Sequence, residues 1–163
     1  MTERSAATIS PAVARLRASR ATTAGADRMY DALEEPSWLG RVVDGTPDRP
    51  DLRRVETDLA FDLTEEHRTL TFRKAAFVDI GQPRRTTDGC VAEVSWRAST
   101  FAPLFPIFAG TVEMRRGQLV LEGVYAPPGG GVGLLDDRGV LRGFAKRTAS
   151  WFLERVSAEL ESD

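Results

Sequence analysis

Few polar side chains of this sequence are placed to do chemistry inside an apolar interior. Lys74 shares the alternating phase of Phe72 and Ala76, which aims its ammonium group toward the buried face of a strand. A lysine in that position could orient an acidic ligand or act as a general base. A β-bulge near Ala75 and Ala76 would instead rotate Lys74 toward solvent. Tyr125 also takes the apolar phase of its segment, and its hydroxyl group needs a partner if it is buried.

A catalytic site would need a placed acid or base in the same interior. Besides Lys74 and Tyr125, only Thr148 and Arg155 of the C-terminal segment could supply one, and these groups form no recognisable catalytic pair. The single histidine, His67, sits among charged residues between two predicted strands, where we expect it to be exposed. With one histidine and one cysteine the chain cannot assemble a His/Cys zinc site. We expect no catalytic residue, no metal ion and no cofactor.

Two further motifs favour structural interpretations. The glycine-rich stretch 129–133 lacks the Lys-Ser/Thr pair of a phosphate-binding P-loop, so we interpret it as a hinge between a strand and the last helix. Asp136 and Asp137 precede that helix, where acidic side chains stabilise the N-terminus without a metal ion. The alternative interpretations are a phosphate cradle and a metal site.

Strands with a period of two must position the candidate groups. An apolar residue recurs at every second position in several segments, as a strand with one buried face requires. These segments are 12–19, 55–63, 70–80, 90–97, 108–115 and 119–126. Consecutive strands of this kind favour an antiparallel sheet with one face covered by other elements.

Short helical patterns follow the first predicted strand. Met29, Ala32 and Leu33 recur at helical spacing, and Pro36 marks the stop. A second short helix could occupy residues 38–43.

A long helix is predicted from about residue 140 to residue 161. Its apolar stripe, with Trp151 at the margin, consists of Leu141, Phe144, Ala145, Thr148, Phe152, Val156 and Leu160. A sheet of six strands must twist, so we expect it to curl round this helix. The expected fold is α+β: a curved six-stranded antiparallel sheet wrapped round a long C-terminal helix, with two short helices after the first strand. It forms a single domain over 1–163, in which 1–11 are a loose N-terminal tail.

Three segments carry a resemblance to a known superfamily. Residues 26–33 read Ala-Asp-Arg-Met-Tyr-Asp-Ala-Leu, residues 104–110 lead into a strand, and residues 121–128 lead out of one. Together they resemble the START-like (SRPBCC) superfamily, the helix-grip domains that include polyketide cyclases, pollen allergens and lipid-transfer domains. The resemblance covers residues 12–160. It implies an apolar cavity between sheet and helix, and no catalytic signature accompanies it.

Large side chains on the concave side would line such a cavity, whereas in a packed domain they would fill the core. The predicted ligand-binding residues are Phe72, Lys74, Trp96, Phe108, Met114, Leu121, Tyr125, Phe144, Thr148 and Phe152. Their chemistry indicates binding or transport of a small hydrophobic ligand without catalysis. Two alternatives stay open: a cyclase- or dehydratase-like enzyme acting on a hydrophobic substrate, and a packed domain that acts through dimerisation.

Composition restricts the partners. The chain has a net charge of −2 and a pI of about 5.6, whereas a nucleic-acid binder needs a basic face. No segment approaches the roughly 20 apolar residues of a membrane span, and the start lacks the apolar core of a signal peptide. A single cysteine, Cys90, gives no sign of an oxidising compartment, so we expect a cytoplasmic protein. The apolar segment 101–108 either packs over an end of the sheet or presents a homodimer surface.

Overall fold

The structure is a computed structural model, and it describes residues 13–43, 49–65, 67–100, 105–126 and 138–162. The α-helices in these ranges are α1 (Ala26–Glu34) and α2 (Arg138–Leu160), and a short 3-10 helix, η1, covers Pro36–Trp38. The strands are β1 (Ala14–Ala21), β2 (Arg41–Val43), β3 (Leu52–Glu65), β4 (Arg68–Gly81), β5 (Arg84–Thr86), β6 (Gly89–Ala98), β7 (Ile107–Arg115) and β8 (Gln118–Ala126). The glycine-rich stretch 129–133, Asp136 and Asp137 lie outside the described residues.

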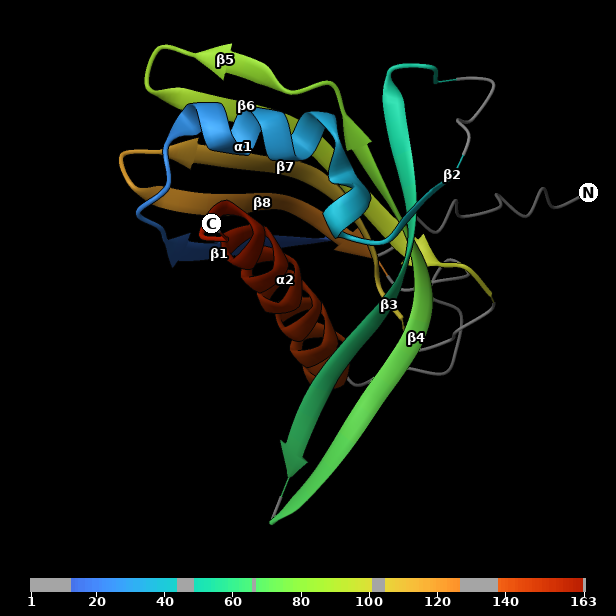
Figure 1. The fold of residues 1–163 in the computed structure, drawn as a ribbon. Coiled ribbons are helices and arrows are strands. Elements are labelled where there is room, and N and C mark those ends of the chain that lie inside the picture. The colour runs from blue at the N-terminus through green and yellow to red at the C-terminus, as the bar shows by residue number, and fades with distance from the viewer. Residues whose placement is uncertain (1–12, 44–48, 66, 101–104, 127–137, 163) are drawn as a thin grey trace, which may run out of the picture.

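The strands form one antiparallel sheet in the order β1-β8-β7-β6-β4-β3-β2, with β5 paired to β6. Figure 1 shows the sheet curving round α2, while α1 lies over the opposite end of the same face. The contacts agree, because α2 packs against β1, β3 and β8, and α1 packs against β5, β6 and β7. The expected helix-grip architecture is therefore confirmed. The described part of the sheet has eight strands instead of six, since β2 and β5 add to the predicted set.

The long helix owes its position to one wide buried face. Buried residues come in adjacent pairs that recur every four positions, which places them on one side of α2. They are Phe144, Ala145, Thr148, Ala149, Phe152, Leu153, Val156, Ser157 and Leu160. Trp151 is half-buried at the margin, as the pattern predicts, and Arg147 and Glu154 are exposed.

The segment 38–43 does not form the second short helix that the sequence favours. The chain makes the single 3-10 turn of η1, and Arg41–Val43 then join the sheet as β2. Arg41 pairs with Glu56 of β3, so the edge of β3 satisfies backbone groups that a helix of this length would leave open. A segment this short also gains little from helix formation, because nucleation is unfavourable.

The other additional strand, β5, is a hairpin partner of β6 that supports α1. Arg85 lies over the ring of Tyr30 at 4.6 Å and forms an ion pair with Asp27. No alternation can be read in three residues, which is why the sequence does not predict β5.

The hairpin of β3 and β4 extends beyond the strands on either side of it. Pairing of β4 with β6 ends at Ala76, and pairing of β3 with β2 ends at Glu56. The remaining two-stranded part, which we name the arm, runs from the pair Asp58–Ala75 to the turn and projects past α2 in Figure 1. Because two strands alone are marginally stable, the arm needs a tertiary anchor.

A cluster of three aromatic rings supplies that anchor. The rings of Phe61 and Phe72 are stacked with centroids 5.1 Å apart. Phe144 of α2 meets both of them edge-on, at 5.6 Å and 5.3 Å. The arm is therefore held to the helix through its inner face.

Candidate functional site

An aromatic row crosses the middle of the concave face, which is the sheet face that packs against α2. Val78 of β4, Trp96 of β6, Phe108 of β7 and Tyr125 of β8 are successive cross-strand partners and so share this face. The rings of Trp96 and Phe108 stack with centroids 4.2 Å apart, and Phe152 of α2 lies 5.7 Å from Trp96. Sheet and helix thus meet through aromatic side chains.

The row contains a polar atom without a partner. The indole Nε1 of Trp96 is buried and has no hydrogen-bond acceptor in the part of the chain that the structure describes. The whole side chain is only 3% exposed, so bulk water does not compensate the N–H group. A buried donor left in this way costs roughly 1–3 kcal/mol, and buried indole groups ordinarily find an acceptor. The N–H group of Trp96 is therefore the interior group most suited to meet an acceptor from outside the chain.

The other predicted residues are spread along the same side of the sheet and along α2, with Met114 six residues from Phe108 on β7 and Leu121 four residues from Tyr125 on β8. Phe108, Met114, Leu121, Tyr125, Phe144, Thr148 and Phe152 are all buried. Phe108, Met114, Leu121, Tyr125 and Phe152 belong to one hydrophobic core, whereas Phe144 packs against the rings of Phe61 and Phe72. Whether any of these side chains also contacts a ligand stays a prediction. The hydroxyl group of Tyr125 makes no hydrogen bond to any described residue.

Lys74 faces inward, as its phase predicts. It pairs directly with the fully buried Leu59, and the β3–β4 ladder runs without interruption on both sides of this pair. The bulge alternative near Ala75 and Ala76 is therefore wrong. Lys74 and Phe72 are both half-buried at the root of the arm, and Lys74 forms no ion pair with any described residue.

Thr148 is less available than its position suggests. Its hydroxyl group donates to the carbonyl oxygen of Phe144, one helical turn earlier, at 2.8 Å. Its proton is used inside α2, which leaves only the oxygen lone pairs for a ligand.

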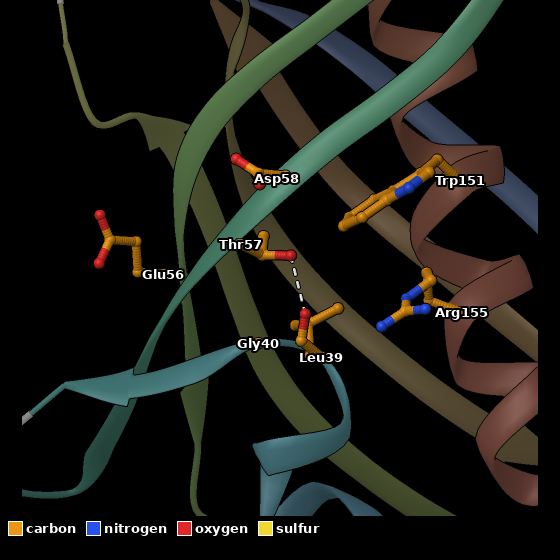
Figure 2. A pocket seen from close by; sticks show the side chains of 7 residues that line it. All are labelled: Leu39, Gly40, Glu56, Thr57, Asp58, Trp151 and Arg155. Carbon is orange, nitrogen blue, oxygen red and sulfur yellow. Dashed lines mark hydrogen bonds between the residues drawn. The ribbon is translucent and has the colours of Figure 1, made fainter.

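A separate pocket of about 350 Å³, which we name the side pocket, lies between α2 and the edge of β3. It is lined by Leu39, Gly40, Glu56, Thr57, Asp58, Trp151 and Arg155. Figure 2 shows Trp151 and Arg155 reaching from α2 toward β3, while Glu56 and Asp58 lie on the far side of that strand. The cationic group that faces the pocket in this view is therefore Arg155.

Local backbone geometry builds the wall opposite α2. Thr57 donates its hydroxyl proton to the carbonyl oxygen of Leu39 at 2.7 Å, which ties the turn after η1 to β3 (Figure 2). A Cβ atom on Gly40 would lie 2.3 Å from the carbonyl oxygen of Glu56, so only glycine permits this approach. Because β2 begins only opposite Glu56, the edge of β3 beyond that residue is open beside the pocket.

This side pocket was not predicted, although one signal for it exists in the sequence. Trp151 and Arg155 are four residues apart on a helix, a spacing that puts both side chains on one face. Leu39 and Thr57 come from distant segments, and the pairing of β2 with β3 brings them together. No periodicity in the sequence encodes that pairing.

Several other predicted features have a clear place in the structure. His67 is exposed in the turn between β3 and β4, with a φ of 72°. In the apolar segment 101–108, the described residues Phe105, Pro106 and Phe108 are buried, whereas Ile107 is exposed. Residues 101–104 lie outside the described residues. The packing interpretation therefore holds for the second half of this segment.

The described residues show neither a cluster of metal-ligating side chains nor a helix that could span a membrane. They contain no group of three or more His, Cys, Asp or Glu side chains that could hold a metal ion. Neither described helix is long and apolar enough to cross a membrane.

Comparison with known proteins identifies relatives by fold alone. No protein-family model matches the sequence, and no characterised protein matches it in sequence. Among solved structures, the di-domain ARO/CYC protein StfQ from the steffimycin biosynthetic pathway superposes on 91% of this chain, with a TM-score of 0.51 and 16% identity. The chain spans 51% of that protein, about half its length.

Two further structures resemble the chain over nearly their whole length. TTHA0849 from Thermus thermophilus gives a TM-score of 0.50 at 13% identity, covering 90% of this chain and 97% of its own. Ara h 8.0201 gives a TM-score of 0.48 at 12% identity, covering 93% of this chain and 100% of its own. At these identities the likeness to StfQ and TTHA0849 establishes a shared helix-grip fold and does not extend to a ligand or a reaction.

Proposed function

We propose that this protein binds a small, mostly apolar molecule between the concave face of the sheet and α2, without catalysing a reaction. The observation that carries the proposal is the buried indole N–H group of Trp96, which has no acceptor in the described chain. The described residues leave this donor uncompensated, so a ligand that supplies an acceptor regains the free energy that the burial of the donor costs. A packed domain without a ligand would gain no stability from retaining this N–H group.

The surroundings of the donor define the ligand class. The ring of Phe108 stacks on the indole ring and that of Phe152 lies tilted beside it, and these aromatic surroundings favour a flat aromatic or polycyclic body. One acceptor atom, such as a ketone oxygen, would meet Nε1 of Trp96. Tyr125 lies in the same row beyond Phe108, and its hydroxyl group offers a second polar contact. Of the remaining predicted residues, Phe72, Met114, Leu121 and Phe144 would supply apolar surface, and Lys74 and Thr148 would supply polar groups.

The arrangement of the polar groups favours binding over the enzyme alternative. Lys74 is on β4 and Tyr125 is on β8, with β6 and β7 between them in the sheet. Three strand spacings, about 14 Å across the sheet, separate the backbones of the two residues. Lys74 is also offset by four residues along β4 from Val78, which is level with Tyr125, so the two groups are poorly placed to act on one reacting bond. The hydroxyl proton of Thr148 is held by Phe144 inside α2. No general acid and base from the described residues therefore converge on the N–H group of Trp96.

The test compares two probes that differ only in the acceptor. Purified protein is titrated with 9-fluorenone and with fluorene, which has the same rings but no carbonyl oxygen. We expect 9-fluorenone to bind about three- to tenfold more tightly, as one neutral hydrogen bond provides. Replacement of Trp96 by 3-benzothienylalanine, an isostere with sulfur in place of N–H, should remove this preference and leave the binding of fluorene unchanged.

Two results would contradict the proposal. Equal affinity of the two probes in the native protein would show that the N–H group of Trp96 meets no ligand. Binding of neither probe, together with a native mass spectrum free of any bound molecule, would favour the packed domain instead. The same spectrum reports whether the protein is a dimer, which is what the packed-domain alternative requires.

A further inference from the structure

We infer that the side pocket is a second binding site, for a flat aromatic molecule that carries a carboxylate group. The inference goes beyond the proposed interior site and does not depend on it. It rests on the pocket of about 350 Å³ between α2 and β3, a size in the range of small-molecule sites.

The guanidinium group of Arg155 provides the anion contact. One of its nitrogen atoms, Nη2, donates to the carbonyl oxygen of Trp38 at 2.7 Å, which fixes the side chain in the pocket. A guanidinium group has five N–H donors, so most of them stay available after this bond. Within the described ranges Arg155 forms no ion pair with a carboxylate. A fixed fork of N–H donors without an acidic partner suits a carboxylate.

The acidic residues that border the pocket do not block this contact. Glu56 forms an ion pair with Arg41, which neutralises it locally. Asp58 belongs to the outer phase of β3 and lies on the opposite side of the strand from Arg155 in Figure 2. The charge that faces the pocket from α2 is therefore positive.

Trp151 provides the aromatic contact. It lies four residues before Arg155 on α2, and its half-buried indole group forms the wall beside the guanidinium group (Figure 2). A ring placed against this indole would bring a carboxylate on its rim toward Arg155. Leu39 and Thr57 close the opposite wall and would contact the other face of the ring.

The experiment uses 2-naphthoate and its neutral analogue 2-naphthamide. We expect 2-naphthoate to bind about tenfold more tightly, because a charge-assisted pair with Arg155 replaces a neutral contact. The preference should decrease as salt is added, since the pair is partly exposed. Arg155→Gln should remove the preference for 2-naphthoate, and the amide of glutamine can still donate to the carbonyl oxygen of Trp38. Arg142→Gln, at an exposed position on another face of the same helix, is the matched control and should leave the preference unchanged.

Nuclear magnetic resonance separates this site from the interior one. The chain has three tryptophans, so a ¹⁵N-labelled sample gives three indole N–H signals. 2-Naphthoate should move the signal of Trp151 and leave that of Trp96 in place. Equal affinity of the two naphthalene probes, or an unmoved Trp151 signal, overturns the inference even if Arg155→Gln fails to fold. That result would leave the expected binding of 9-fluorenone beside Trp96 unchanged, so each proposal can fail without the other.

Discussion

At the scale of single residues, two tryptophans of this protein form a natural comparison. The indole N–H group of Trp38 donates to the carbonyl oxygen of Ala32 at 2.7 Å, whereas that of Trp96 has no acceptor in the described chain. The same chemical group is therefore satisfied at one position and unsatisfied at the other. The difference affects folding stability as well as binding.

Replacing each indole in turn by 3-benzothienylalanine should change stability in opposite directions. At Trp96 the change removes an unsatisfied donor, so the free energy of unfolding without ligand should rise by about 1–3 kcal/mol. At Trp38 it removes a formed hydrogen bond, so the free energy should fall by about 1 kcal/mol. Urea denaturation of the two variants and the native protein measures both values. A loss of stability at both positions would contradict the prediction.

The sequence predicts which side chains are buried but not which of them are satisfied. Alternation in 90–97 places Trp96 on the concave face, and the structure confirms its burial. Whether an acceptor lies within reach of Nε1 depends on the neighbours that β7 and α2 bring, namely Phe108 and Phe152. Both neighbours present apolar rings that offer no acceptor. Only the tertiary structure shows that these two residues are the neighbours of Trp96.

At the scale of elements, one glycine of the helix can be replaced without a clash, whereas one glycine of the sheet cannot. Gly143 lies inside α2, and a Cβ atom there would meet nothing within 4 Å. Gly110 of β7 pairs with Gly123 of β8, and a Cβ atom on Gly110 would lie 2.2 Å from the carbonyl oxygen of Glu122. The first glycine only weakens its helix, whereas the second permits two strands to pack closely.

Alanine should therefore stabilise one element and destabilise the other. Gly143→Ala should raise the free energy of unfolding by about 0.4–1 kcal/mol, because alanine restricts the unfolded chain and favours the helix. Gly110→Ala should lower it by about 1–3 kcal/mol, since backbone atoms of β8 must move aside. Thermal denaturation followed by circular dichroism checks both. If Gly110→Ala melted at the native temperature, the close contact of these strands would be wrong.

Element prediction succeeded wherever a segment was long enough to show its period. The stripe from Phe144 to Leu160 predicts α2, and the alternation in 55–63 and 70–80 predicts the long strands β3 and β4. The short strand β2 escapes prediction because it exists through its pairing with Val55 and its neighbours. The side pocket escapes for the same reason, since Gly40 and Thr57 meet there only after β2 has joined the sheet.

At the scale of the whole molecule, the free thiol of Cys90 reports on opening of the entire fold. Cys90 lies on β6, which is paired with β5 on one side and β7 on the other. It is fully buried in the core that α1 and the sheet share. A reagent can therefore reach the thiol only when these elements separate.

Burial also links this thiol to the pH dependence of stability. Desolvation raises the pKa of Cys90 above the ordinary thiol value, and the charge of Arg85 opposes the shift in part. Below about pH 8.5 the thiol is protonated in both the folded and the unfolded chain, so it adds no pH dependence. Above that value the unfolded chain releases the proton while the folded chain retains it. The free energy of unfolding should then fall by up to about 1.4 kcal/mol per pH unit, until the folded pKa is passed.

Cys90→Ala isolates this contribution, because the other titrating groups are the same in both proteins. The variant should lose a roughly constant amount of stability below about pH 8, from the smaller side chain, and should show a weaker decline than the native protein at higher pH. Urea denaturation across this range measures both slopes.

Alkylation of the native protein by iodoacetamide measures access to the thiol. We expect alkylation near neutral pH to be limited by unfolding and to slow in variants of higher stability, such as Gly143→Ala. Rapid alkylation of the folded protein, or identical slopes for the two proteins, would mean that the sheet and α1 do not seal Cys90 from water. A sealed core is what makes the unsatisfied N–H group of Trp96 costly, so this measurement also tests the premise of ligand binding beside it.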